Sequence, residues 1–346
     1  MPEPSAVEPE LLAAAQQDDQ DAFGRLVSPY RAQLYAYCYR MLGSTHDAED
    51  AVQDAFVKAW KGITGFEGRA SLKGWLYRIA TNVCLDQIRR RPRRILTDDY
   101  GPPASPDVEI TGPVTEPIWL EPCPDHLLAL DPAAGYELRE SVELAFLVAL
   151  QHLPANQRAV LILREVLAFS AAEVAATLDT SVASVNSALQ RARATVREQP
   201  RSQRAELAEL GDAGQRELLA AFIGALQRSD VDAMVALLAE DVRFTMPPMP
   251  FWFDGRADVI AFLTGVVLRE SWRRIPVRCN GQLAFAAYMD RGEGHRLVAV
   301  DVLTVRDGRI AAITAFPSAA VLGVFNLPTA FADLAAAETS AYGRSG

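Results

Sequence analysis

Hydrophobic residues recur every three or four positions in two separate parts of the chain, and they alternate with polar residues in a third part. Helical spacing covers residues 21–91 and returns over 137–198, with a further helical start near Gln215. Beyond Glu240 the pattern is that of strands, and prolines interrupt the segment between the two helical parts. The pattern predicts two helical domains joined by a linker, followed by a domain of helices and then strands.

Two helices of the first block carry opposite charges on their exposed faces. Segment 45–62 is amphipathic, and segment 71–91 begins at Ser71, a residue suited to cap a helix. The polar face of the first consists of Asp47, Asp50, Gln53 and Asp54. The polar face of the second consists of Lys73, Arg78, Arg89, Arg90 and Arg91. The basic face suits phosphate neutralisation, with an ordinary solvated surface as the alternative for both helices.

The loop between these helices, GITGFEGRA, is rich in glycine and contains Phe66 and Arg69. Such a loop brings the backbone close to a ligand, and it offers an aromatic ring or a guanidinium for stacking on an unpaired base. The residues of this loop therefore add a second nucleic-acid feature to the basic helix.

The second helical block has the spacing of a helix-turn-helix. Ser170 and Glu173 predict a capping box on a short helix, a turn follows at 178–180, and Ser181 can cap the next helix. That helix is expected to bury Val182, Val185, Leu189, Ala192 and Val196. Its outward side carries Ala183, Ser184, Asn186, Ser187, Gln190, Arg191 and Arg193. Short polar groups followed by arginines suit base reading and phosphate contact, and two helices packed without DNA are the alternative.

The net charge of −10, taken alone, argues against a nucleic-acid binder. The charge is unevenly spread, however, with about +8 in residues 58–94 and about −10 in 95–150. Cations therefore gather at the candidate DNA-binding helix. Half of the residues are hydrophobic, which excludes a disordered chain and fits two or three domains.

The four cysteines lie far apart in the sequence, and no C-x-x-C pair suggests zinc or a redox dithiol. Cys38, Cys84, Cys123 and Cys279 are predicted to be small hydrophobic residues, and no metal or cofactor is expected. The sequence has neither an apolar run of membrane length nor the features of a signal peptide, so we expect a cytoplasmic protein with no membrane partner.

These segments resemble the extracytoplasmic-function class of the sigma-70 family of bacterial RNA polymerase sigma factors. DAEDAVQDAFVKAW is similar to the helix that binds core polymerase, FEGRASLKGWLYRIATNVCLDQIRRR to the −10 reader, and LPANQRAVLILREV with SAAEVAATLDTSVASVNSALQRAR to the −35 reader. The resemblance implies a multidomain chain with two all-α domains, sigma region 2 at 21–94 and the helix-turn-helix of region 4 at 137–203. Residues 1–20 would be a flexible N-terminus and 95–136 an acidic, proline-rich linker.

The resemblance also implies a role for each exposed face. Core polymerase would contact Asp47, Glu49, Asp50, Gln53 and Asp54. The −10 element, with one base extruded toward the loop, would contact Phe66, Arg69, Lys73, Arg78, Asn82, Asp86, Arg89 and Arg90. The −35 element would contact Ser181, Ser184, Asn186, Ser187, Gln190, Arg191 and Arg193. Family members commonly carry a basic residue where Asn186 and Ala188 stand, so the strength and sequence of this −35 contact are left open.

The linker is acidic, but it contains the apolar run Ile118, Trp119 and Leu120, so part of it is expected to dock against protein. In the family that the chain resembles, the connector runs through the positively charged RNA path of the polymerase, where an acidic strand could mimic RNA. Neutral residues in place of Glu109, Glu116, Glu121 and Asp125 should then alter abortive synthesis and core affinity.

Residues 204–335 resemble a SnoaL-like, steroid-isomerase-like α+β cone, with a tail at 336–346. Helices precede three successive strands, and Asp307-Gly308 predicts a hairpin between the last two. Candidate ligand-pocket residues are Phe244, Met246, Trp252 and Asp301, with a closed aromatic core as the alternative. Asp301 lies in an apolar strand, where a carboxylate needs a partner such as Arg278 or Arg296.

The sequence favours a transcription initiation factor, not an enzyme, that binds core polymerase and promoter DNA and whose C-terminal domain modulates its activity. An anti-sigma factor and a small-molecule ligand stay open as further partners. An isomerase or hydrolase of the cone fold with a DNA-binding leader is the alternative, because a buried carboxylate in this fold can serve as acid or base. A third reading, an operator-binding repressor, differs in having no polymerase contact.

Overall fold

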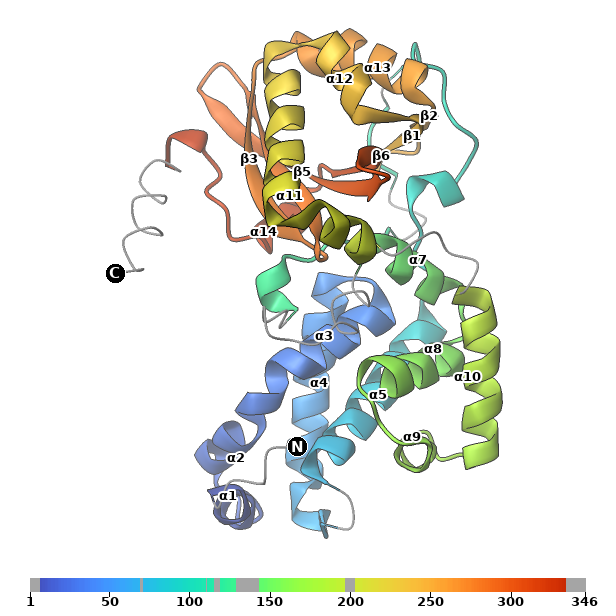
Figure 1. Cartoon of the computed structure of the whole chain (residues 1–346). Coiled ribbons are helices and arrows are strands. Elements are labelled where there is room, and N and C mark those ends of the chain that lie inside the picture. The colour runs from blue at the N-terminus through green and yellow to red at the C-terminus, as the bar shows by residue number, and fades with distance from the viewer. Residues whose placement is uncertain are drawn as a thin grey trace. The chain divides into compact units, whose positions relative to one another are not determined.

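The computed structural model describes residues 7–68, 71–109, 111–114, 119–128, 143–196 and 203–333. The chain divides into two compact units, each of which draws on two separate stretches of sequence (Figure 1). One unit contains residues 1–93 and 126–199, and the other contains 94–125 and 200–346. The acidic linker therefore belongs to the same unit as the C-terminal domain.

The first unit begins with five helices that enclose an apolar core. They are α1 (Val7–Ala15), α2 (Gln20–Val27), α3 (Arg31–Leu42), α4 (Thr45–Gly62) and α5 (Leu72–Arg90). Ser44 and Ser71 cap α4 and α5 by accepting backbone N–H bonds from Asp47 and Gly74, which confirms the N-cap expected at Ser71. The expected flexible N-terminus instead contains α1, because the Gln16 side chain just beyond it donates to the carbonyls of Ile63 and Phe66.

The other half of this unit contains α7 (Leu144–His152), α8 (Ala155–Leu161), a π-helical turn (Ile162–Val166), α9 (Ala171–Thr177) and α10 (Val182–Val196). The capping box is confirmed, since Glu173 N donates to Ser170 Oγ and Ser170 N donates to the Glu173 carboxylate. The turn between α9 and α10 passes through Asp179 at φ 51°, a conformation that Asp tolerates. The helix-turn-helix predicted from the spacing is present.

The two helical halves of this unit pack against each other. α3 contacts α7 and α8, and α5 contacts α8 and α9. Arg158 is 4% exposed, and its guanidinium donates to the carbonyls of Met41, Gln151 and Leu153 and to the Gln151 side chain. The rings of Tyr77 and Phe169 meet edge to face with centroids 5.2 Å apart. Burial lowers the pKa of Arg158 to about 10, and four acceptors bind its two terminal nitrogens, while Nε has no partner among the described residues.

The second unit is built on a six-stranded sheet with the order β2-β1-β6-β5-β4-β3. The strands are β1 (Leu238–Thr245), β2 (Trp252–Asp254), β3 (Trp272–Cys279), β4 (Gln282–Asp290), β5 (His295–Arg306) and β6 (Arg309–Phe316). All neighbours are antiparallel except β1 and β6. The predicted hairpin is confirmed, because Arg306 pairs with Arg309 across Asp307 (φ 52°) and Gly308 (φ 71°).

Helices cover one face of this sheet and enclose its core. They are α11 (Gln203–Arg228), α12 (Val231–Leu237) and α13 (Arg256–Gly265), with the short α14 (Ala319–Gly323) following β6. α11 contacts β3, β4 and β5, and the rings of Phe222 and Phe285 lie 6.2 Å apart between helix and sheet (Figure 1). Every second residue along each strand faces the helices, and residues such as Phe244, Leu303 and Ala315 complete this core.

Candidate polymerase, promoter and linker sites

Three of the five residues expected to contact polymerase are exposed on α4. Asp50, Gln53 and Asp54 are exposed, one turn apart on the same face of the helix. With Gln87, Arg90 and Arg91 of the α5 end they line an open hollow of about 360 Å³. The hollow carries carboxylates from α4 and guanidinium groups from the end of α5, so it can bind both cationic and anionic groups of a partner.

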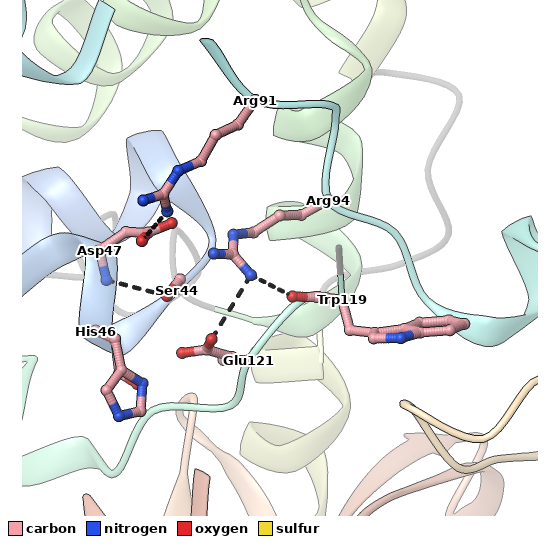
Figure 2. A network of polar contacts seen from close by, with 8 residues as sticks. Ser44, His46, Asp47, Arg91, Arg94, Trp119 and Glu121 are labelled. Carbon is pink, nitrogen blue, oxygen red and sulfur yellow. Dashed lines mark hydrogen bonds and ion pairs between the residues drawn. The ribbon is translucent and has the colours of Figure 1, made fainter. Parts of the chain in front are cut away.

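The other two expected residues, Asp47 and Glu49, already have partners within the unit. Asp47 is 7% exposed, and its carboxylate accepts a charged hydrogen bond from Arg91, which Figure 2 shows turned toward it. The Glu49 carboxylate pairs with Arg31 and accepts a 3.2 Å bond from Gln53. The expectation of an open Asp47 was wrong, because the chain returns after α5 and places Arg91 over the start of α4.

The −10 residues expected on α5 fall into two groups. Arg78, Asn82, Asp86 and Arg89 follow one another at helical spacing, and Arg78, Asn82 and Arg89 are exposed. Arg89 pairs with Asp86 at 3.2 Å, and the exposed Arg90 continues the cationic surface. This polar stripe can contact a nucleic-acid backbone and offers an amide at its centre.

Lys73 points elsewhere, since its ammonium lies 5.4 Å from the Phe169 ring centroid and 5.9 Å from that of Tyr77. Phe66 is half-buried, with its ring centroid 5.0 Å from that of Trp75. Arg69, the other loop residue expected at the −10 element, lies outside the described residues. The structure therefore brings Phe66 beside an aromatic partner, while Lys73 belongs to the contact between the two helical halves.

On α10 the expected outward set is exposed, comprising Ser181, Ser184, Asn186, Ser187, Gln190, Arg191 and Arg193. Two of these groups have local partners: Ser181 Oγ accepts the Ser184 N–H at 3.1 Å, and Arg193 forms an ion pair with Glu165. The buried stripe is confirmed at Val185, Leu189 and Ala192. Val182 was expected to join that stripe but is 44% exposed at the first position of α10, and the expected Val196 at the other end is half-buried.

Of the four candidate pocket residues of the C-terminal domain, Phe244, Met246 and Asp301 lie on the core side of the sheet and Trp252 does not. Phe244 lies with the core on the helix-covered face, paired with Phe253 and Ile313. Trp252 pairs with Thr245, one residue further along, so it projects from the opposite face. Its indole N–H donates to Gly101 O of the linker at 2.7 Å, while Met246 is half-buried against the core. Trp252 is thus the candidate that the sheet register separates from the others.

Asp301 lies at the centre of β5, opposite Phe285 and Ala315, and projects toward the core. Burial raises its pKa to about 7, and the cation that partly offsets this is Arg274. Arg274 is itself 6% exposed, and burial lowers its pKa to about 10. The expected partners Arg278 and Arg296 were wrong: Arg274 lies on the face of Asp301 and is the cation that acts on it, whereas Arg278 lies 3.5 Å from Gln215. Among the described residues, Asp301 Oδ1 has no hydrogen-bond partner.

The linker binds both edges of the sheet. At the β2 edge, Ala104 N donates to Trp252 O at 2.7 Å, and Asp98 lies 3.6 Å from Arg243. At the β3–β4 turn, Cys123 N donates to Asn280 Oδ1 at 2.8 Å, and Asn280 N donates back to Cys123 O at 3.0 Å. These contacts dock the linker on the C-terminal domain, as the sequence predicted from the apolar run 118–120. Ile118 of that run lies outside the described residues.

Within the linker, Arg94 fastens the two ends of the segment together. Figure 2 shows its guanidinium between the Trp119 carbonyl, at 2.6 Å, and the Glu121 carboxylate, at 3.6 Å. Leu120 N donates to Ile95 O at 2.9 Å in the same bridge. The Tyr100 ring lies 5.6 Å from that of Trp119. Arg94 and the bond between Leu120 and Ile95 therefore hold the two ends of the linker together, with Trp119 beside Tyr100.

Three protein families match successive parts of the chain. Sigma-70 region 2 matches residues 26–94, Sigma-70 region 4 matches 143–196, and the SnoaL-like domain matches 219–313. The chain is also 40% identical over 313 residues to the ECF RNA polymerase sigma factor SigG of Mycobacterium tuberculosis (strain H37Rv), covering 88% of this chain and 84% of that protein. The chain belongs to the ECF sigma factors.

Other relatives of this sigma factor are ECF sigma factors too. SigJ of Mycobacterium tuberculosis (strain H37Rv) is 30% identical over 297 residues, which cover 82% of this chain and 88% of SigJ. SigW of Bacillus subtilis (strain 168) is 33% identical over 183 residues, 53% of this chain and 91% of SigW. The crystal structure of SigJ superposes with a TM-score of 0.59 over 87% of this chain and 98% of that one, at 24% identity, so it shares the fold.

As a sigma factor, the protein directs core RNA polymerase to promoter DNA. Sequence reasoning did not single out Arg158, which reaches Met41 far away in the sequence. It placed Arg91 on an exposed face, because the partner Asp47 lies 44 residues away and leaves no local signal. Within the described ranges, no three His, Cys, Asp or Glu side chains gather as metal ligands would. Nor does any described helix combine the length and the apolarity needed to cross a membrane.

Proposed function

We propose that this sigma factor reads the −10 element with the exposed stripe of α5 and the −35 element with the outward face of α10. The observation that carries the proposal is the helix-turn-helix, in which α10 is held by Val185 and Leu189 while its polar side chains are exposed. Arg191 and Gln190 follow the short residues by two turns, where phosphate and base edges are within reach.

Core polymerase is bound through Asp50, Gln53 and Asp54, the exposed residues of the expected acidic set. Their carboxylates and amide face an open hollow, so a basic helix of the polymerase can enter without displacing an internal ion pair. Asp47 is assigned to fold stability instead, because its carboxylate is taken by Arg91. We place the protein in the cytoplasm, where polymerase acts.

The C-terminal domain acts on the linker. It binds the linker at both sheet edges, and it engages linker carboxylates, since Asp98 lies beside Arg243 and Asp125 Oδ1 accepts Gly281 N at 2.8 Å. The acidic linker was expected to enter a positively charged path of the polymerase. The domain and the polymerase therefore compete for the same segment, which makes the domain a modulator of activity and not an enzyme.

Run-off transcription with core polymerase tests this function directly. The full chain is compared with a truncation after Arg204 on templates selected from a random promoter pool. Promoter-dependent transcripts from the full chain are expected, with a different yield from the truncation. No transcript from either protein would remove the promoter-reading function. Turnover of a small molecule that is lost in Asp301→Asn would instead favour a cone-fold enzyme with a DNA-binding leader.

A further inference from the structure

The first turn of α10 presents an apolar side chain to solvent. Val182 is 44% exposed, whereas Val185, Leu189 and Ala192 of the same helix are at most 5% exposed. It is one of four large hydrophobic side chains exposed to this degree among the described residues; the others are Val57, Tyr100 and Val231. Exposure of a β-branched side chain at this position is not explained by packing within the unit.

The polar groups beside Val182 are occupied by the helix itself. Ser181 Oγ accepts Ser184 N at 3.1 Å, and the two hydroxyl oxygens lie 2.9 Å apart. Ala183 is exposed and has no polar side-chain atom. The first turn of α10 is therefore more apolar than its serines suggest. Asn186, Ser187 and Gln190, further along the helix, are the side chains left to form hydrogen bonds with bases.

The major groove of DNA exposes one apolar group, the 5-methyl of thymine. We propose that Val182 determines −35 specificity by packing its methyl groups against a thymine methyl at the upstream end of the element. The inference rests on the proposed entry of α10 into the −35 major groove. Removing one buried methyl group from such a contact weakens binding about fourfold.

The experiment uses holoenzyme assembled from the full chain and core polymerase, with a promoter that this holoenzyme has selected from a random pool. Each thymine of the −35 element, on both strands, is replaced singly by deoxyuridine, which lacks only the methyl group. Equilibrium binding is measured for wild type, Val182→Ala and Val182→Ile. One replacement is expected to weaken wild-type binding about threefold to fivefold, to leave Val182→Ala unchanged and to affect Val182→Ile as it affects wild type.

Three outcomes would overturn the inference: a selected element without A·T pairs, no deoxyuridine position that affects wild type, or an undiminished deoxyuridine effect in Val182→Ala. Val182→Ile keeps the test open if the alanine variant folds poorly. Scrambling the whole −35 element separates this inference from the function on which it rests. If scrambling has no effect, α10 does not read the element; if scrambling weakens binding but deoxyuridine does not, only the role of Val182 fails.

Discussion

Charged residues of this sigma factor divide between holding the fold and meeting partners, and residue type alone does not separate the two. Asp47 and Asp54 lie on the same helix, both in a sequence pattern typical of a polymerase-binding face. The Asp47 side chain is 10% exposed and bonded to Arg91, while Asp54 is open to solvent. Their substitution should therefore have separate consequences.

Asp47→Asn is expected to destabilise the first unit by about 1.5–3 kcal/mol, the usual range for a hydrogen bond to a charged group. Core polymerase affinity measured below the melting temperature should stay close to wild type. Asp54→Asn should do the reverse, lowering affinity in a competition assay without changing thermal unfolding. Arg91→Ala is the matched control and should reproduce the loss seen in Asp47→Asn; equal effects of both aspartate variants on affinity would contradict the assignment.

Asp301 predicts a pH-dependent stability of the sheet. Its pKa of about 7 in the fold exceeds the ordinary value near 3.9, so the folded state favours the protonated carboxyl. The protonated carboxyl contributes its full share to the free energy of unfolding below about pH 4. This contribution is lost as the pH rises to about 7, by at most about 1.4 kcal/mol per pH unit. Asp301→Asn should remove this pH dependence, and above pH 7 β5 should be more stable in the variant than in the wild-type protein.

Hydrogen-exchange protection of β5 in the full chain, corrected for the intrinsic effect of pH, measures the difference. Asp307→Asn is the control, because Asp307 is exposed in the β5–β6 turn and Asn tolerates its positive φ. Parallel pH profiles for wild type and Asp301→Asn would show that the carboxyl is already ionised or solvated in the fold.

At the scale of elements, features with local chemistry could be predicted, and features set by distant contacts could not. The capping box at Ser170 and the hairpin at Asp307-Gly308 each follow from a few adjacent residues. Strand β3 was missed because its segment, SWRRIPVRC, contains three arginines and a proline, which are unusual in a buried strand. An edge strand such as β3 tolerates both charged residues and proline. The partner of Asp301 was misassigned for a related reason: without β3, its register and hence Arg274 could not be placed.

The linker should detach from the sheet when its anchor at the β3–β4 turn is removed. Asn280 is fully buried at φ 54°, and its side chain accepts Cys123 N. Asn280→Gly keeps this backbone conformation but leaves a buried N–H without its acceptor, at a cost of about 1–3 kcal/mol. Amide protection across residues 120–123 should fall roughly tenfold, and transcription at limiting sigma factor should rise as polymerase gains the linker.

Asn326→Gly provides the matched control, since Asn326 has φ 51° and is exposed in a segment away from the linker. It should leave both linker protection and transcript yield unchanged. If Asn280→Gly frees the linker but transcription does not change, the domain does not compete with polymerase for this segment.

At the scale of the whole molecule, the two promoter readers pack together in one unit although their targets lie apart. The centres of elements at −10 and −35 are separated by about 25 base pairs, or on the order of 80 Å along B-DNA. The contact between α5 and α9 through Tyr77 and Phe169 cannot persist while both elements are read. Lys73, assigned by the sequence to the −10 element, becomes available to DNA when this contact opens.

Phe169→Ala should weaken the contact between the readers, because aromatic pairs contribute about 0.5–1.5 kcal/mol beyond their buried area. Energy transfer between dyes at exposed positions 61 and 194 measures the separation, and the four native cysteines are buried and free. Wild type should lose transfer on binding polymerase and promoter, whereas Phe169→Ala should show reduced transfer when free. The variant then binds core polymerase a few-fold more tightly, because less free energy is spent on opening. Equal transfer in the two free proteins, or unchanged wild-type transfer on the promoter, would mean that the packed readers do not restrain this sigma factor.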